Sequence, residues 1–299
     1  MALDERRASL EQQHVRWLQA YLPDSHQACA ELCEWATARH ARAGGTLKVR
    51  IVKGANLAME KVEAELHGWP QAPYGSKAEV DASFKALVET ALDPRWAAAV
   101  RVGLASHNLF DIAWAMGLPA RNRIEFEMLE GMATAQSREV QRRVDDVLLY
   151  APVVRHDDLP ASIAYLTRRL DENTSADNFL RALFTLRPGT AEWDAQADRF
   201  RAAMAAKGAV RFGSHRTQRR AEPVPTTDPT LPAFHNSADT DWTQASNREW
   251  AAGHMAALPR HDVTVLDTVE AIDEVVEHAV RAAKLWREST YAERRALLA

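Results

Sequence analysis

Leu47-Lys-Val-Arg-Ile-Val-Lys53 is an apolar, β-branched run that ends on a cation just before a glycine. Four further apolar runs occur at 17–22, 100–106, 124–129 and 147–153, and helix-like segments at 27–42, 80–92, 109–116 and 133–144 lie between them. A strand–helix alternation of this kind predicts a parallel sheet with helical crossovers, open or closed. We therefore expect an α/β protein with five consecutive β/α units.

Length and composition exclude several classes of protein. The 299 residues carry a net charge of −4, and no apolar run approaches the roughly 20 residues that cross a bilayer. The amino terminus, Met1-Ala-Leu-Asp-Glu-Arg-Arg7, lacks the apolar core of an export signal. The only cysteines, Cys29 and Cys33, have no second pair with which to bind a metal. We expect a cytoplasmic protein without a transmembrane segment, in which both cysteines are reduced packing residues.

Polar or turn-forming residues follow each of the five apolar runs. The ends are Gln19-Ala-Tyr-Leu-Pro-Asp24, Arg50-Ile-Val-Lys-Gly-Ala-Asn56, Ser106-His-Asn108, Glu127-Met-Leu-Glu-Gly-Met132 and Tyr150-Ala-Pro152. In a parallel β/α barrel the chemistry takes place at the carboxyl ends of the strands. These ends collect cations, amide side chains, a histidine and small residues, which favours a shared phosphate-bearing ligand. The alternative is five loops of unrelated chemistry.

The segment 159–173 reads as a helix with two different faces. Asp157 and Asp158 supply acceptors for its start, and Pro160 is tolerated in the first turn. One stripe is apolar and is expected to face a core; it consists of Leu159, Ile163, Leu166 and Leu170. A second stripe, about 140° away, consists of Tyr165, Arg168, Arg169 and Glu172.

Two interpretations of the second stripe remain open. It can be a solvated face with an ion pair between Arg168 and Glu172, although the order of cation before anion is the weaker one in a helix. It can also bind a carboxylate substrate, because a guanidinium group holds a planar anion with two parallel hydrogen bonds.

Five motifs, in order along the chain, resemble those of the flavin-dependent proline dehydrogenase domain. They are Val49-Arg-Ile-Val-Lys-Gly-Ala55, Ala105-Ser-His-Asn-Leu109, Phe126-Glu-Met-Leu-Glu-Gly-Met132, Leu149-Tyr-Ala-Pro-Val153 and Tyr165-Leu-Thr-Arg-Arg-Leu-Asp-Glu-Asn173. The chain is similar in particular to the bifunctional proline utilization A proteins, in which this barrel precedes an aldehyde dehydrogenase domain. The resemblance covers roughly residues 15 to 185.

The resemblance implies a (β/α)8 TIM-type barrel that uses FAD to oxidise L-proline to 1-pyrroline-5-carboxylate, in proline catabolism, with a further electron acceptor that reoxidises the flavin. The positions that match FAD contacts are Gln19, Arg50, Lys53, Gly54, Ala55, Ser106, His107, Asn108, Glu127, Met128, Arg169, Glu172 and Phe179. Arg168 and Arg169 match the pair that holds the proline carboxylate. Tyr150, Tyr165 and Ile51 match positions around the proline ring.

The resemblance also has gaps. The five motifs correspond to the fourth through eighth strands of the family barrel, so the chain reads as a fragment that lacks the first three. The run 14–18 is unusually polar for a buried parallel strand. The alternative to an active enzyme is a truncated, non-catalytic remnant that cannot close the barrel or bind FAD alone. Unpaired sheet edges also predict self-association. An unrelated barrel lyase is a weaker alternative, because no Schiff-base lysine or metal site stands out.

Composition divides the chain into three parts. We expect a partial barrel at 1–185, a helical connection and irregular linker at 186–262, and a third part at 263–299. The linker carries a basic cluster and a proline-spaced stretch, but no nucleic-acid motif, so nucleic-acid binding is not expected. Helices at 268–287 and from 291 are similar to the opening helices of an aldehyde dehydrogenase domain. No nucleotide-binding loop or nucleophilic cysteine follows them, so L-glutamate gamma-semialdehyde dehydrogenase activity is not expected in this chain.

Overall fold

A parallel β-sheet forms the centre of the protein. The computed structural model describes residues 15–54, 56–144, 147–151, 153–174, 178–183, 185–222, 237–257 and 265–298. Within them, five strands pair in chain order, and every pairing is parallel. The strands are β1 (Val15–Gln19), β2 (Leu47–Val52), β3 (Val100–Ala105), β4 (Ile124–Leu129) and β5 (Val147–Tyr150). The predicted alternation of parallel strands with helices is confirmed.

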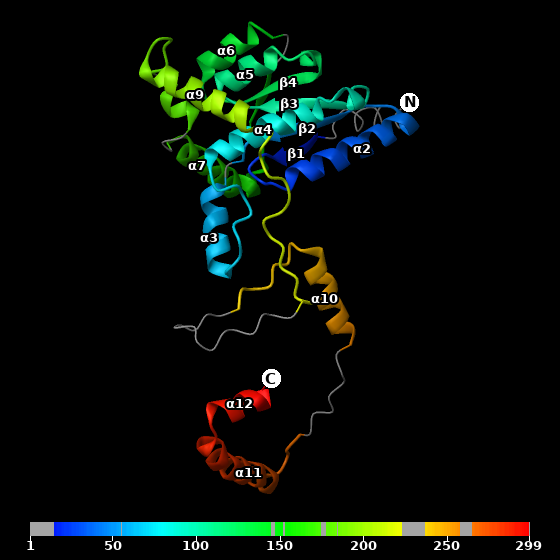
Figure 1. Ribbon diagram of the computed structural model, residues 1–299, viewed down its shortest axis with the longest axis vertical. Coiled ribbons are helices and arrows are strands. Elements are labelled where there is room, and N and C mark those ends of the chain that lie inside the picture. Colours follow the sequence, from blue (N-terminus) through cyan, green and yellow to red (C-terminus); the bar gives the residue numbers. More distant parts are fainter. Residues whose placement is uncertain are drawn as a thin grey trace. The chain divides into compact units, whose positions relative to one another are not determined.

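The sheet is curved, as a contact between its first and last strands shows. Neighbouring strands lie about 4.8 Å apart, so a flat sheet would hold β1 and β5 about 19 Å from each other. Yet Trp17 of β1 and Tyr150 of β5 meet edge to face, with ring centroids 6.2 Å apart. The five β/α units therefore form an arc of the kind found in a TIM-type barrel (Figure 1).

Helices cover the convex face of the arc and bury alternate strand residues. This layer contains α2 (Ser25–Ala43), α4 (Lys77–Ala91) and α5 (Leu109–Met116), and α4 packs against α2, β2, β3 and α9 (Ala191–Ala206). Val49, Val102 and Phe126 point into this layer and are buried. Cys29 and Cys33 of α2 belong to the same core and are free, as their expected packing role requires.

Local sequence sets the start of α4. Ser76 accepts a hydrogen bond from the backbone N–H of Glu79, and the Glu79 carboxylate accepts one from the backbone N–H of Ser76. This reciprocal capping box satisfies two N–H groups that a helix start leaves unpaired. An additional helix, α3 (Leu57–His67), precedes α4 and was not expected. Its apolar side chains Met59, Val62 and Leu66 share one helix face by their spacing but are exposed, so this face does not pack on the core.

The later units contain α6 (Thr134–Gln141) and α7 (Leu159–Thr174), with short 3-10 turns at Pro94–Trp96, Arg121–Arg123 and His156–Asp158. The helix predicted at 159–173 is present. The expectation that its apolar stripe faces a core is wrong, because Leu159, Ile163, Leu166 and Leu170 are 42–66% exposed. No element in the described part of the chain covers that face.

The chain after the arc is more ordered than expected. α8 (Phe179–Ala182) and α9 lie on either side of Arg187-Pro-Gly189, where a proline and a glycine follow one another. The irregular linker expected within 186–262 contains one helix in the described residues, α10 (Ala245–Ala256). Asn247 is fully buried; it accepts a hydrogen bond from the Arg220 backbone N–H at 2.8 Å and donates one to the Asp241 carbonyl at 3.0 Å. The proline-spaced stretch 223–232 lies outside the described residues.

The structure divides into two compact units, the first ending at Arg248 and the second beginning at Glu249. The second unit contains α11 (Val269–Glu288) and α12 (Tyr291–Leu298), as the sequence predicts. The Thr268 side chain caps α11 by accepting a hydrogen bond from the Ala271 backbone N–H. None of the helices in the described ranges is long and apolar enough to cross a membrane.

Candidate active site

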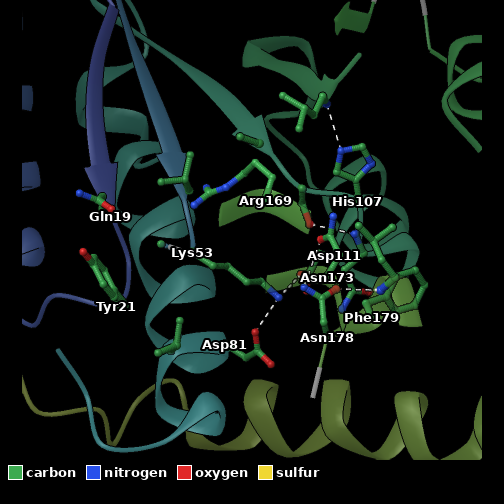
Figure 2. Close-up of a pocket in the computed structure, with 18 of the residues that line it drawn as sticks. Gln19, Tyr21, Lys53, Asp81, His107, Asp111, Arg169, Asn173, Asn178 and Phe179 are labelled. Atoms are coloured by element: carbon green, nitrogen blue, oxygen red, sulfur yellow. Dashed lines mark hydrogen bonds and ion pairs between the residues drawn. The ribbon is translucent and has the colours of Figure 1, made fainter. Parts of the chain in front are cut away.

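A cavity of about 510 Å³ opens at the carboxyl ends of the strands. All five strands or their immediate ends contribute to its wall, together with residues of α4, α5, α7, α8 and α9. Figure 2 shows several of these side chains, among them Lys53, His107 and Arg169. Parallel β/α proteins bind their ligands at this end of the sheet. The cavity is therefore the candidate active site.

Arg50 is the central cation of the strand wall. It lies in the middle of β2, is 7% exposed, and its Nε donates a hydrogen bond to the carboxylate of Glu127 on β4. Glu127 is 2% exposed and also lies 3.3 Å from the Nζ atom of Lys48. The charge of this buried carboxylate is thus compensated by two cations.

Gly103 makes this ion pair possible. It lies on β3, between β2 and β4, and pairs in register with Arg50. A Cβ atom at position 103 would come within 2.2 Å of the Glu127 Oε1 atom. Only the missing side chain lets Glu127 reach across β3 to Arg50.

A series of contacts between aromatic rings and guanidinium groups crosses the cavity. The Arg50 guanidinium carbon lies 5.0 Å from the centroid of the Trp17 ring and 5.2 Å from that of Tyr150. Tyr150 meets Tyr165 of α7 with ring centroids 6.4 Å apart, and the Arg169 guanidinium lies 5.2 Å from the Tyr165 centroid. Such contacts attract a cation to the face of a ring, so the series connects the strand wall to α7.

Lys53, just beyond the end of β2, lies at the centre of a buried ionic network. Its Nζ atom is 2.6 Å from Asp81 of α4 and 2.7 Å from Asp111 of α5 (Figure 2). Asp111 also binds Lys85 at 2.9 Å, and Asp81 binds Lys77 at 2.7 Å. Both members of the Lys85–Asp111 pair are about 1% exposed in their side chains.

The pKa values of the network follow from burial and pairing. Burial alone would lower the pKa of Lys53, but Asp111 and Asp81 outweigh it, so the pKa lies above the ordinary value. Burial would likewise raise the pKa of Asp111, and the charges of Lys53 and Lys85 hold it below the ordinary value. Burial lowers the pKa of Lys85. Lys53 and Asp111 are therefore ionised at neutral pH.

His107 presents an unused donor to the cavity. The backbone N–H of Leu129 donates a hydrogen bond to His107 Nε2 at 3.0 Å. Because a backbone N–H can only donate, Nε2 is the acceptor, and the neutral ring carries its hydrogen on Nδ1. Burial lowers the pKa of His107, which favours this neutral form. Nδ1 is buried and has no hydrogen-bond partner among the described residues, so it can donate to a ligand.

The turn after β3 is shaped by its own side chains. Ser106 Oγ accepts a hydrogen bond from the Asn108 backbone N–H, and Asn108 Oδ1 accepts one from the Phe110 backbone N–H. Asn108 thereby caps α5 and is itself one of the residues that line the cavity. The N-terminus of α5 also carries the positive end of the helix dipole, which favours an anion nearby.

The turn after β2 depends on a glycine. Gly54 has φ +107°, and a Cβ there would lie 2.4 Å from the Tyr21 ring. Tyr21 is buried, borders the cavity and donates a hydrogen bond to Glu60 at 3.3 Å. Burial, with Glu60 beside it, raises the pKa of Tyr21 to about 12, so its hydroxyl stays protonated.

Most of the residues singled out in the sequence meet in this cavity. The wall includes Gln19, Arg50, Lys53, Gly54, Ser106, His107, Asn108, Glu127, Met128, Tyr150, Tyr165, Arg168, Arg169 and Phe179. Ile51 departs from the expectation, because it is fully buried in the core under the helices. Successive strand residues point to opposite faces, so Arg50 in the cavity puts Ile51 on the other side. Ala55 and the Glu172 side chain lie outside what the structure describes.

A second wall was missed from the sequence. It consists of residues from the crossover helices and the helix after the arc, namely Lys77, Asp81, Lys85, Asp111, Gln196, Arg199 and Phe200. Lys77, Asp81 and Lys85 recur every four residues and so share one face of α4. This spacing of alternating charges is the sequence feature from which the α4 part of the wall could have been predicted. The contribution of α9 has no comparable local signal, because it depends on tertiary packing.

The cavity as a whole is cationic. Seven cationic and three acidic side chains are among its described lining residues, an excess of four positive charges. Together with the unpartnered Nδ1 of His107, this excess suits a ligand with several negative charges and hydrogen-bond acceptors.

The fold and the position of the cavity place the chain among parallel β/α proteins of the barrel type. The model of the proline dehydrogenase family matches residues 3–182, and the chain belongs to that family. Among curated relatives it is similar to the bifunctional protein PutA of Escherichia coli (strain K12), with 29% identity over 178 residues, which make up 56% of this chain and 13% of that protein.

Solved structures agree with this assignment. The chain is similar to proline utilization A from Corynebacterium freiburgense, with 38% identity, a TM-score of 0.64, and coverage of 88% of this chain and 24% of that one. It is also similar to proline utilization A from Bdellovibrio bacteriovorus inactivated by N-propargylglycine, with 31% identity, a TM-score of 0.60, and coverage of 82% and 24%. The chain thus spans about a quarter of the length of these structures.

Proposed function

We propose that the cavity binds FAD and L-proline and that the chain is the proline-oxidising part of a proline dehydrogenase. The observation that carries this proposal is the cationic cavity itself, in which Arg50, Lys53, His107 and the α7 arginines gather at the strand ends. Because the chain belongs to the proline dehydrogenase family, we take proline as its substrate. The electron acceptor that reoxidises the flavin is a further expected partner.

The strand wall suits the cofactor. FAD carries a diphosphate, and Lys53, whose charge is fixed by two carboxylates, lies where an anionic group could bind. Arg50 and the Nδ1 donor of His107 suit the acceptor atoms of a flavin ring. FAD, when bound, accepts a hydride from the carbon next to the proline nitrogen, and loss of a proton from that nitrogen gives 1-pyrroline-5-carboxylate.

The α7 wall suits the substrate. Arg168 and Arg169 are half-buried neighbours that line the cavity, and Arg168 Nε is buried without a hydrogen-bond partner among the described residues. Two guanidinium groups can fix a carboxylate in direction as well as position. Tyr150 and Tyr165 approach one another beside them and can enclose the apolar ring of proline. Orienting the substrate in this way is the main contribution that these residues make to the reaction.

One observation favours an alternative function. The apolar stripe of α7 is exposed, and both edge strands lack a neighbour among the described residues. The arc by itself can therefore be a non-catalytic remnant that retains the site residues but does not hold FAD.

The test is to purify the chain, record its flavin absorption spectrum, and titrate it with FAD by calorimetry. Bound FAD together with proline-dependent reduction of a dye acceptor supports the proposal. N-propargylglycine, a secondary amine with a carboxylate as proline is, should then abolish the activity. Absence of FAD binding, in a chain whose circular dichroism shows it to be folded, overturns the proposal and favours the remnant.

Variants separate the two walls. Arg168→Ala should lower kcat/KM for proline by roughly ten- to a hundredfold, because a lost charge-assisted contact costs about 1.5–3 kcal/mol. FAD content should barely change in this variant. Arg50→Ala should instead lower the FAD content. The matched control is Arg181→Ala, an exposed cation on α8 outside the cavity, which should retain the parent kinetics. If Arg168→Ala also retains them, the carboxylate clamp is wrong.

A further inference from the structure

The helix α11 exposes a continuous apolar stripe. Ile272, Val276, Ala279 and Ala283 lie within about 40° of one direction around the helix at 100° per residue. All four side chains are exposed, and Ile272 and Val276 are 45% and 53% accessible. Within the second unit, no described element buries this stripe. A helix with such a face is stable in water when the face is buried against a partner.

The charges of α11 are divided between its two halves. Its first nine residues carry four carboxylates and no cation, and positions 278–287 carry three cations and no carboxylate. The helix dipole favours such an order only within the first and last turns. Asp273, Glu277 and Lys284 lie further in, so the dipole does not account for them.

The divided charges lie along one border of the apolar stripe. Asp273, Glu277, Lys284 and Arg287 all fall between about 60° and 140° from Ile272 on the same side. The opposite border carries Ala271, His278 and Ala282, which offer no matching charges. Glu277 also contacts Arg281 of its own helix at 3.4 Å, an exposed pair of small energetic value.

We propose that α11 is an interaction surface that pairs, in antiparallel orientation, with α11 of a second copy of this chain. A two-fold axis across the stripe near Val280 brings each charged border against the same border of its partner. Asp273 of one copy then lies opposite Arg287 of the other, and Glu277 lies near Lys284. Parallel pairing would instead bring the charged border against the uncharged one, so the charge pattern selects the antiparallel arrangement.

The size of the surface sets the strength of the dimer. A helix of 20 residues is about 30 Å long, so the two stripes form an interface at the small end of those found in stable complexes. The dimer is weak and concentration-dependent. The inference uses no residue of the cavity and is independent of the proposed function.

A charge-swap experiment on the full chain tests the pairing. Sedimentation velocity over a range of concentrations should show a monomer–dimer equilibrium for the parent chain. Asp273→Lys with Glu277→Lys should weaken the dimer about a hundredfold, because both symmetric sets of pairs become repulsive. Lys284→Glu with Arg287→Glu should do the same. Mixing the two variants should restore a dimer, since each then offers the charge that the other lacks.

A matched control separates the effect of the lost ion pairs on dimerisation from the effect of the changed net charge. Glu31→Lys with Glu34→Lys changes the net charge as much as the first variant, but both exposed residues lie on α2 and not on α11. This control should dimerise as the parent does, and far-UV circular dichroism should confirm that all variants remain helical. A monomeric parent, swapped variants that still dimerise, or a mixture that stays monomeric overturns the inference. Association that survives every change in α11 would assign self-association to the open edges of the sheet instead.

Discussion

The strand wall and the α7 wall of the cavity are fixed in different ways. In the strand wall, Arg50 and Glu127 are buried and paired, and Lys53 is held by two carboxylates. The arginines of α7 are only half-buried, and the opposite face of their helix is open to water. The strand wall is therefore preformed by this chain. The position of the α7 wall depends on whatever covers its apolar face.

The largest effect is expected from the ionic network of the strand wall. Asp111→Asn leaves Lys85, a cation about 1% exposed, without its carboxylate, which should cost about 3–5 kcal/mol of unfolding free energy. Asp198→Asn removes an exposed ion pair with Arg201 and should cost at most about 1 kcal/mol. Urea denaturation followed by circular dichroism measures both. Equal small losses would show that the network is hydrated in solution and that the strand wall is not rigid.

A matched pair of leucines compares the two walls directly. Leu87→Ala removes a side chain buried in the core of α4 and should cost about 2–5 kcal/mol of unfolding free energy. Leu170→Ala changes a residue of α7 that is 66% exposed, and should change the free energy by less than about 0.5 kcal/mol. The same denaturation assay applies. A large loss for Leu170→Ala would mean that the apolar stripe is covered in solution.

A smaller, pH-dependent effect is expected in the helical layer behind the strands. His26 of α2 is buried, bonds Ser83 of α4 and stacks on Phe212, and burial lowers its pKa to about 4. Below pH 6.5 His26 of the unfolded chain becomes protonated, whereas His26 of the folded chain stays neutral until about pH 4. Stability should therefore fall by up to about 3 kcal/mol as the pH decreases through this window.

The histidine contribution can be isolated by substitution. His26→Gln cannot take up this proton, so its unfolding free energy should depend less on pH between 4 and 6.5 than that of the parent. His40→Gln on the same helix serves as the control. Curves for His26→Gln and the parent that run parallel over this window would assign the pH dependence to the carboxylates alone.

The strands could be predicted because buried parallel strands are nearly continuous apolar runs, as 100–105 illustrates. Two helices show the limit of this reasoning. α3 carries Met59, Val62 and Leu66 at the spacing of one helix face, yet all three are exposed, so an apolar stripe does not by itself identify a helix that packs on the core. The periodic leucines of α7 show that one face is apolar, but periodicity cannot say whether any part of the same chain covers it.

The candidate site could be predicted where residues follow strands directly, as Lys53 and His107 do. The wall formed by α4 had a signal in the charges of Lys77, Asp81 and Lys85, whereas the part formed by α9 had none, because it reaches the cavity only through tertiary packing. Ile51 shows a second limit. Its neighbour Arg50 lines the cavity, and the alternation of strand residues then requires Ile51 to point away from it.

Gly103 makes the order of sequence changes matter during the divergence of this protein. Because a Cβ there would lie 2.9 Å from the Glu127 carboxyl carbon, as well as against its oxygen, alanine at 103 is accepted only after position 127 has become shorter. That permitted order passes through an intermediate in which Arg50 loses its buried partner, whereas the reverse order passes through one in which the new Cβ clashes with Glu127. The two positions are therefore epistatic. In related chains that carry a larger residue at the position of Gly103, we expect a residue shorter than glutamate at the position of Glu127.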